Sequence, residues 1–141
     1  MSSEKDKLKS LIEDAEKLHG HLGPFLVIGV RMGVIVQKIL SEKMYATVKV
    51  PFSTPFSCVI DGVQSTTKCT VGNQKLKIED SKGEIVAYFK ASNPSKTLKI
   101  TVNPKTVDEL LRRFSEGASS EELAWEIARK PQHELFGIET Q

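Results

Sequence analysis

Apolar residues recur at helical spacing through the first forty residues of the chain. From Leu8 to Leu18 they lie three or four positions apart, which predicts an amphipathic helix over 4–18. The segment 24–40 is apolar on nearly all sides, so the pattern predicts a second helix that its neighbours bury. Gly29 and Gly33 share one face of it and favour the close approach of another helix, either from the same chain or from a second subunit.

The rest of the chain alternates between strand and helix patterns. Strands are predicted over 45–50, 75–79, 85–90 and 97–102, and helices over 56–67, 105–114 and 120–130. Strand 85–90 is the most apolar and is expected at the centre of the sheet, and turns at 81–83 and 92–95 favour an antiparallel meander. The tail Gln132–Gln141 either is loose or docks through Leu135, Phe136 and Ile138. The predicted fold class is α+β, an antiparallel sheet of about four strands packed with N-terminal helices and a C-terminal helical pair.

Length and composition predict one globular domain over residues 1–141. Apolar residues make up 39% and charged residues 27%, and the net charge is +2, which argues against a partner such as nucleic acid or a membrane held mainly by charge. The charged N-terminus has no apolar run of the kind that makes a secretory signal. Segment 24–36 is too short to span a bilayer. Two cysteines make no disulfide framework, so we expect reduced thiols and a cytoplasmic protein.

The stretch His19-Gly20-His21 is the first candidate for chemistry. Imidazoles bind metals or transfer protons near neutral pH, and Gly20 allows the first helix to end between the two rings. Pro24 then suits the first turn of the next helix. Because positions i and i+2 of a continuous helix point in nearly opposite directions, both histidines face one ion only if the helix ends there. A lone His-x-His pattern is more often without metal.

Cys58 and Asp61 add a thiol and a carboxylate. Cys58 lies near the start of its short helix, where the helix dipole is expected to lower the thiol pKa and favour a thiolate. Thiolate, imidazole and carboxylate together suit zinc or a similar divalent ion. Cys69 shares such a site only if the chain doubles back after Thr67, since eleven helical residues span about 16 Å. The alternative for both cysteines is a small buried apolar side chain.

Two further polar residues have open assignments. Gln64 lies one turn from Asp61 and can orient it or a substrate by hydrogen bonds. Arg31 sits inside the apolar helix, so its charge either pairs with a carboxylate such as Asp61 or a bound anion, or reaches solvent.

Two motifs resemble a known family. His19-Gly20-His21-x-x-Pro24 with Gly29-x-Arg31-x-Gly33, and Cys58-x-x-Asp61-x-x-Gln64 with Thr67-x-Cys69-Thr70-x-Gly72-Asn73, are similar in order and spacing to motifs of the FmdE family, which is named for formylmethanofuran dehydrogenase. The resemblance covers about residues 8–115 and leaves a C-terminal helical extension over about 105–141.

The resemblance implies an α+β core domain, commonly a homodimer, with a histidine and cysteine pocket for a divalent metal, zinc being the expected ion. It also implies oxidoreductase subunits as partners. Its metal ligands here would be His19, His21, Cys58 and Cys69. Two departures stand out: Gly23 replaces the cysteine of the usual His-Gly-His-x-Cys-Pro, and the paired cysteines of a C-terminal zinc ribbon are missing.

The leading hypothesis is therefore a stand-alone domain of this family that binds a divalent ion, with Cys58 and Asp61 as the candidate catalytic groups and Gln64 and Arg31 as candidate binding residues. The alternative is a non-catalytic accessory or binding module that has lost its metal. A third hypothesis, a redox pair of Cys58 and Cys69, requires their Cα atoms to lie within about 7 Å.

Overall fold

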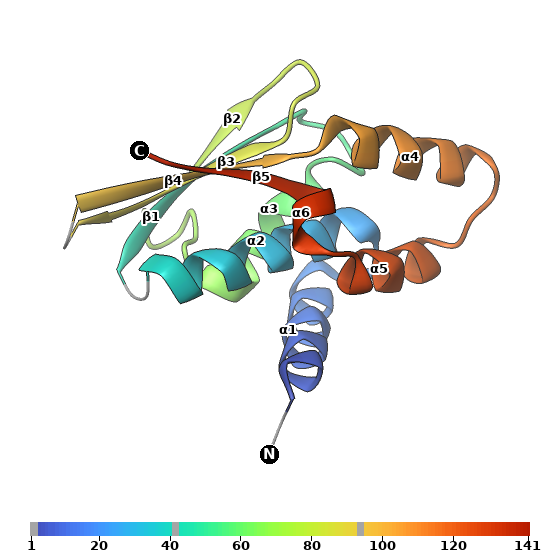
Figure 1. The fold of residues 1–141 in the computed structure, drawn as a ribbon, viewed down its shortest axis with the longest axis horizontal. Helices are drawn as coiled ribbons and strands as arrows, with labels where there is room; N and C mark the ends of the chain where they lie inside the picture. Colours follow the sequence, from blue (N-terminus) through green and yellow to red (C-terminus); the bar gives the residue numbers. More distant parts are fainter. Residues whose placement is uncertain (1–2, 41–42, 93–94) are drawn as a thin grey trace.

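The computed structural model describes residues 3–40, 43–92 and 95–141 and confirms the α+β class. Figure 1 shows a sheet with most of the helices on one side. The helices are α1 (Glu4–His19), α2 (Pro24–Leu40), α3 (Cys58–Thr67), α4 (Pro104–Ser115), α5 (Ser120–Arg129) and α6 (Gln132–Leu135). The strands are β1 (Met44–Val50), β2 (Leu76–Asp80), β3 (Val86–Ser92), β4 (Ser95–Val102) and β5 (Phe136–Thr140).

The sheet is mixed rather than antiparallel, which corrects the predicted meander. Its order is β2-β1-β3-β4-β5, and β2 runs parallel to β1 instead of pairing with β3. The reason is the helix between them, because α3 supplies the crossover that parallel neighbours require. The pairs β1–β3, β3–β4 and β4–β5 are antiparallel, and β3 is the central strand as predicted. Asn93 and Pro94, in the predicted turn at 92–95, lie outside the described residues.

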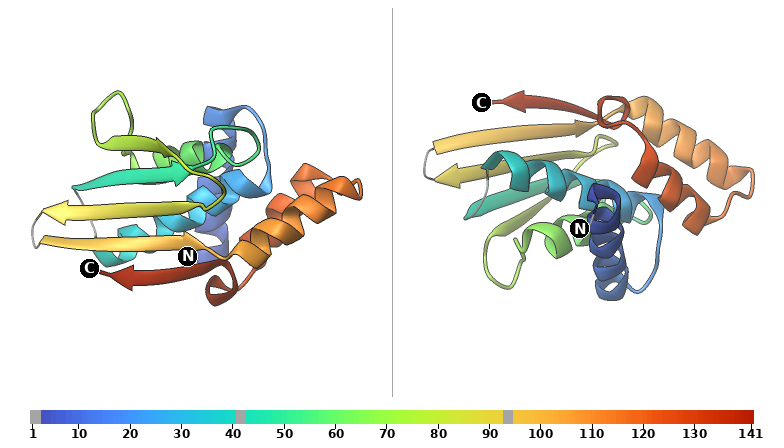
Figure 2. Two further views of the ribbon diagram at one scale, coloured as in Figure 1. Left: turned by 90° about the horizontal axis from the view of Figure 1, so that it is seen from above. Right: turned by 60° about the horizontal axis from the view of Figure 1, so that its bottom comes forward.

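The C-terminal tail is docked. Leu135 and Phe136 are buried, and residues Phe136–Thr140 add β5 to the edge of the sheet beside β4. Between the two strands α4 and α5 extend from one end of the sheet, as both views of Figure 2 show. The chain thus returns to the sheet after leaving it, which fixes both ends of the C-terminal helical pair.

One face of the sheet carries the core. The view from above in Figure 2 shows the strands in front of the helices, and the central helix α2 packs between the sheet and α3. Phe25, Leu26 and Ile28 of α2 and Phe89 of β3 are among the fully buried side chains. None of the helices in the described ranges is both long and apolar enough to cross a membrane.

The glycine face of α2 packs against α3 of the same chain. A Cβ on Gly29 would meet the carbonyl oxygen of Val59 and would lie 3.0 Å from the Cα of Gly62. A Cβ on Gly33 would lie 2.6 Å from the Cβ of Thr66. The two alternatives drawn from the sequence are therefore decided for packing within the chain. This contact also fixes the start of α3, and Cys58 with it, relative to α2.

Candidate functional site

The bend between α1 and α2 forms one wall of the site. His19 is the last residue of α1, and Gly20 follows it in the left-handed conformation with a φ of 86°. Its N–H donates to the carbonyl of Glu16 over 2.6 Å, which ends the helix as predicted. His21 thus lies outside α1, three residues before Pro24 begins α2, so the two imidazoles are not held on opposite faces of one helix.

A chain of hydrogen bonds holds the His19 ring from behind. The ring atom Nδ1 lies 2.6 Å from Oδ2 of Asp61, and both side chains are partly shielded from solvent. The other oxygen of Asp61, Oδ1, accepts a hydrogen bond from Nε2 of Gln64 over 3.0 Å. Gln64 in turn accepts a bond from the backbone N–H of Val71 over 3.4 Å. Since Nδ1 is occupied, Nε2 is the His19 nitrogen left for a ligand.

His19, His21 and Cys58 line one small cavity, which we call the His/Cys cavity. Its volume is about 30 Å³. The lining residues are His19, His21, Gly23, Pro24, Phe25, Leu26, Pro55, Cys58, Phe114 and Ser120. A cavity needs about 10–15 Å³ to hold one water, so this one has room for an ion or a few water-sized groups. The sequence therefore identified three of the polar groups around the cavity.

Cys58 is a thiol here rather than the predicted thiolate. Burial raises its pKa above the ordinary value, and the nearby negative charge of Asp61 raises it further. A backbone hydrogen bond acts in the opposite direction and is the smallest of these effects. The expectation from the helix dipole was wrong because the half-buried position and the carboxylate outweigh it. A metal bound at this sulfur would have to displace a proton.

Cys69 lies at the other end of α3. It follows the helix by two residues, is 2% exposed, and its Sγ donates to the carbonyl of Met44 over 3.3 Å. The ten residues of α3 separate it from Cys58, a span of about 15 Å at 1.5 Å per residue. The chain does not double back after Thr67, and the structure does not bring the two sulfurs together. Both cysteines are free.

Arg31 points away from Asp61. It is two positions from Gly29 and Gly33, which face α3, so its side chain leaves the opposite side of α2. Its Nη1 donates to the carbonyl oxygen of Ile127 over 2.9 Å and to that of Lys130, at the end of α5. Partial burial lowers the pKa of the Arg31 guanidinium. The partner foreseen for this charge, a carboxylate or an anion, is thus replaced by helix-end carbonyls.

The donor types of the cavity suit zinc, although the ligands are not preassembled. Two imidazoles and one thiol are the donors that Zn²⁺ takes in proteins, and a carboxylate behind a histidine is the usual support of such a ligand. Within the described ranges, however, no three side chains of His, Cys, Asp or Glu stand close enough together to hold an ion as they are. The residues fit the ion in kind, and its binding requires their side chains to turn toward one another.

Phe114 and Ser120 were not foreseen as site residues. They come from the end of α4 and the first residue of α5, more than fifty residues after Cys58 in the sequence. No motif or spacing in the sequence marks them, because their place depends on how the C-terminal helices dock on the bend at His21.

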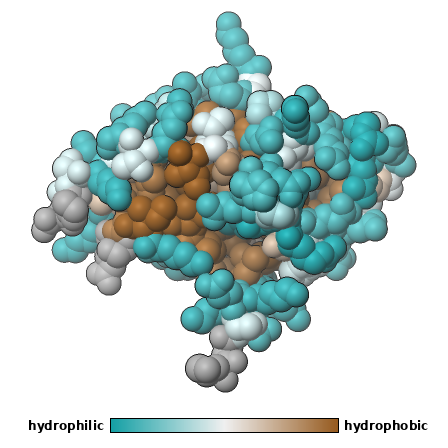
Figure 3. Space-filling model, viewed as in Figure 1, coloured by the Kyte–Doolittle hydropathy of each residue, from teal (hydrophilic) through white to brown (hydrophobic). Residues whose placement is uncertain are grey.

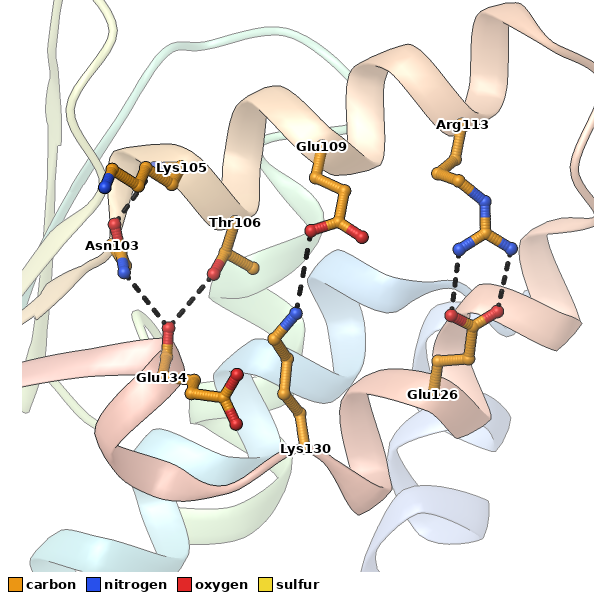
Figure 4. A network of polar contacts seen from close by, with 8 residues as sticks. All are labelled: Asn103, Lys105, Thr106, Glu109, Arg113, Glu126, Lys130 and Glu134. Carbon is orange, nitrogen blue, oxygen red and sulfur yellow. Dashed lines mark hydrogen bonds and ion pairs between the residues drawn. The ribbon is translucent and has the colours of Figure 1, made fainter.

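A second and larger cavity lies between α4 and α5. Its volume is about 250 Å³, and Leu110, Leu123 and Ile127 give it apolar walls. Figure 4 shows the polar contacts that cross between the two helices. Both Nη atoms of Arg113 donate to the carboxylate of Glu126 over 2.9 Å, and Lys130 lies 3.7 Å from Glu109. The bond from Arg113 holds the pKa of Glu126 below its usual value.

Comparison with known proteins assigns the chain to a family. Residues 18–137 match the family described as "FmdE, Molybdenum formylmethanofuran dehydrogenase operon". The chain belongs to the FmdE family. The match includes both histidines of the bend, Cys58 and the whole sheet, and it extends through the C-terminal helices to β5.

A solved FmdE-like structure and one curated relative are similar to the chain. The crystal structure of an FmdE-like protein of the tungsten formylmethanofuran dehydrogenase type, from Syntrophus aciditrophicus, matches with a TM-score of 0.71 at 20% identity. That match covers 95% of this chain and 71% of the other, and it shows the shared fold. A "Probable S-adenosyl-L-methionine-binding protein" of Archaeoglobus fulgidus is 30% identical over 92% of this chain. The chain spans only 42% of that relative.

Proposed function

We propose that this FmdE-family domain binds a divalent metal ion, most simply zinc, in the His/Cys cavity. The ligands would be Nε2 of His19, a ring nitrogen of His21 and Sγ of Cys58. The observation that carries the proposal is the 2.6 Å contact between His19 Nδ1 and Asp61, because a carboxylate on the second ring nitrogen is the usual support of a metal-bound histidine. Cys69 and Arg31 are left out of the ligand set for the geometric reasons above.

When bound, the ion would supply Lewis-acid chemistry to a group in the remaining coordination position. The chain's own residues have separate tasks. Asp61 fixes the tautomer of His19, and Gln64 fixes Asp61, so that the ring keeps one orientation. Cys58 gives up its proton when the ion binds, and its raised pKa makes this release strongly dependent on pH. Asp61 and Cys58 are thus the candidate groups for proton transfer in any reaction here.

The test is metal analysis of protein purified without a metal-affinity tag. We expect about one equivalent of metal per chain in the parent, and loss of most of it in Cys58→Ser and His19→Ala. Cys69→Ser is the matched control, since it changes the other cysteine, at the far end of α3, and its hydroxyl keeps a donor for Met44. A parent protein with no metal after growth in zinc-supplemented medium would refute the proposal. If that protein also co-purified with dehydrogenase subunits, the accessory role would take its place.

The same proposal includes the setting in which the domain works. Free cysteines support a reducing compartment such as the cytoplasm. A homodimer is supported by the apolar area that Figure 3 shows over the C-terminal half of α2 and the strands beside it. Two large side chains of this part of the chain, Ile39 and Tyr45, are 45% and 52% exposed. Light scattering on the purified protein measures the oligomeric state directly.

S-adenosyl-L-methionine is a second candidate ligand, carried over from the description of the Archaeoglobus relative. The observation that favours it is the cavity between α4 and α5, because the molecule has an apolar body with an amino group and a carboxylate. Glu126 and Arg113 present the complementary charges beside the apolar walls. Equilibrium dialysis with labelled S-adenosyl-L-methionine tests this, with Arg113→Met expected to abolish binding. A parent protein that retains none of the ligand would rule the candidate out.

A further inference from the structure

The missing side chain at position 23 is replaced by a residue from the other end of the chain. A Cβ on Gly23 would lie 2.8 Å from Oγ of Ser120 and 3.7 Å from Cε1 of His21. The Ser120 hydroxyl therefore occupies the space that a side chain at position 23 would fill. It donates a hydrogen bond to the carbonyl of Leu22 over 3.0 Å, which ties the first residue of α5 to the bend before α2.

This contact closes one side of the His/Cys cavity. Ser120 and Phe114 are the lining residues that come from the C-terminal helices, and all the others come from the first 58 residues. The far end of α5 is tied to the same helix, since Arg31 of α2 binds the carbonyls of Ile127 and Lys130. With both of its ends fixed to the α2 region, α5 keeps Ser120 against Gly23.

We propose that Ser120 is a specificity-determining residue of the His/Cys cavity. Its hydroxyl, seated against Gly23, limits the cavity to an ion with water-sized partners and keeps larger molecules away from Cys58. The proposal deepens the proposed function, on which it rests for the identity of the ion. The physical argument is volume: about 30 Å³ remains with Ser120 in place, whereas a water needs about 10–15 Å³.

The first test needs no metal, because it measures how fast Cys58 reacts with thiol reagents of two sizes. In metal-free protein with the Cys69→Ser background, we compare alkylation by iodoacetamide and by the bulkier N-ethylmaleimide. Ser120→Ala removes the bond to Leu22, so we expect the N-ethylmaleimide rate to rise about fivefold relative to iodoacetamide. Ser115→Ala, an exposed serine at the end of α4, is the control and should leave the ratio unchanged. An unchanged ratio in Ser120→Ala would overturn the proposal.

The second test asks whether Gly23 and Ser120 fit each other. Gly23→Ala alone should also increase the N-ethylmaleimide rate, because its Cβ would push the Ser120 hydroxyl away. The backbone of Gly23 is not in the left-handed region, so alanine itself is tolerated there. In the Ser120→Ala background the same substitution should change the rate little, since the hydroxyl it meets is gone. Additive effects of the two substitutions would contradict the pairing.

The third test connects the pair to the metal. The double variant Gly23→Cys with Ser120→Ala places a thiol beside His21 and removes the hydroxyl that blocks it. We expect it to retain zinc against a chelator at least tenfold better than the parent. Zinc retention equal to that of the parent would refute the assignment of Ser120 to the metal site. If neither protein bound zinc while the alkylation results held, the proposed function would fail and the role of Ser120 in closing the cavity would stand.

Discussion

His19 and Asp61 are joined by a contact of 2.6 Å between Nδ1 and Oδ2, although 42 residues separate them in the sequence. The contact links the last residue of α1 to the first turn of α3. It is possible because α2 and α3 meet through glycines, which lets the two helices lie with their backbones in contact. A residue choice made for packing thus brings an imidazole and a carboxylate into line.

Replacing the carboxylate tests whether this contact supports metal binding. Asp61→Asn keeps the size of the side chain but removes the charge that holds Nδ1 of His19. We expect the metal affinity to fall by about 10–100-fold, the usual cost of losing such a supporting group. Competition with a fluorescent chelator measures it. Asp108→Asn, on the exposed surface of α4, is the matched control. Equal affinities of the two variants would show that Asp61 has no part in the site.

The reactivity of Cys58 should depend on pH in a way that Asp61 controls. Because burial and the Asp61 charge raise its pKa, the rate of alkylation should still be increasing at a pH where an ordinary thiol is already ionised. Asp61→Asn removes a negative charge that opposes the thiolate, so it should shift the profile to lower pH and increase the rate at neutral pH. The rates are measured with iodoacetamide in the Cys69→Ser background. A profile that Asp61→Asn leaves in place would mean that burial alone sets the pKa.

The helix contact beneath the site should be sensitive to one methyl group. In Gly29→Ala the new Cβ would meet the backbone of Val59, which has no flexible side chain to move aside. We expect the free energy of unfolding to fall by about 1–3 kcal/mol, the usual cost of overpacking, even though alanine favours the helix. Urea unfolding measures it. Gly137→Ala is the control, because nothing lies within 4 Å of the added atom. Equal stability of the two variants would argue against the tight contact.

The sequence predicted the helices well because their apolar spacing reports directly which faces are buried. It did not predict the pairing of β2, since an alternating pattern shows that a strand has a buried face and not which neighbour it has. The same limit applies to the site. His19, His21 and Cys58 belong to short motifs and were found, whereas Ser120 reaches Gly23 only through the docking of α5. The pKa of Cys58 was misjudged because burial and a charge on the same helix depend on the folded chain.

Arg31 separates a structural role from a binding role. Its guanidinium binds the carbonyls of Ile127 and Lys130, so Arg31→Met should leave the last carbonyls of α5 without these donors. We expect a loss of about 1–3 kcal/mol in the free energy of unfolding, measured by urea unfolding, with unchanged metal content. Arg112→Met, which removes an exposed pair with Glu116 one turn away, should cost at most about 0.5 kcal/mol. A variant that kept its stability and lost the metal would instead place Arg31 among the binding residues, because only a contact with the site would then explain its effect.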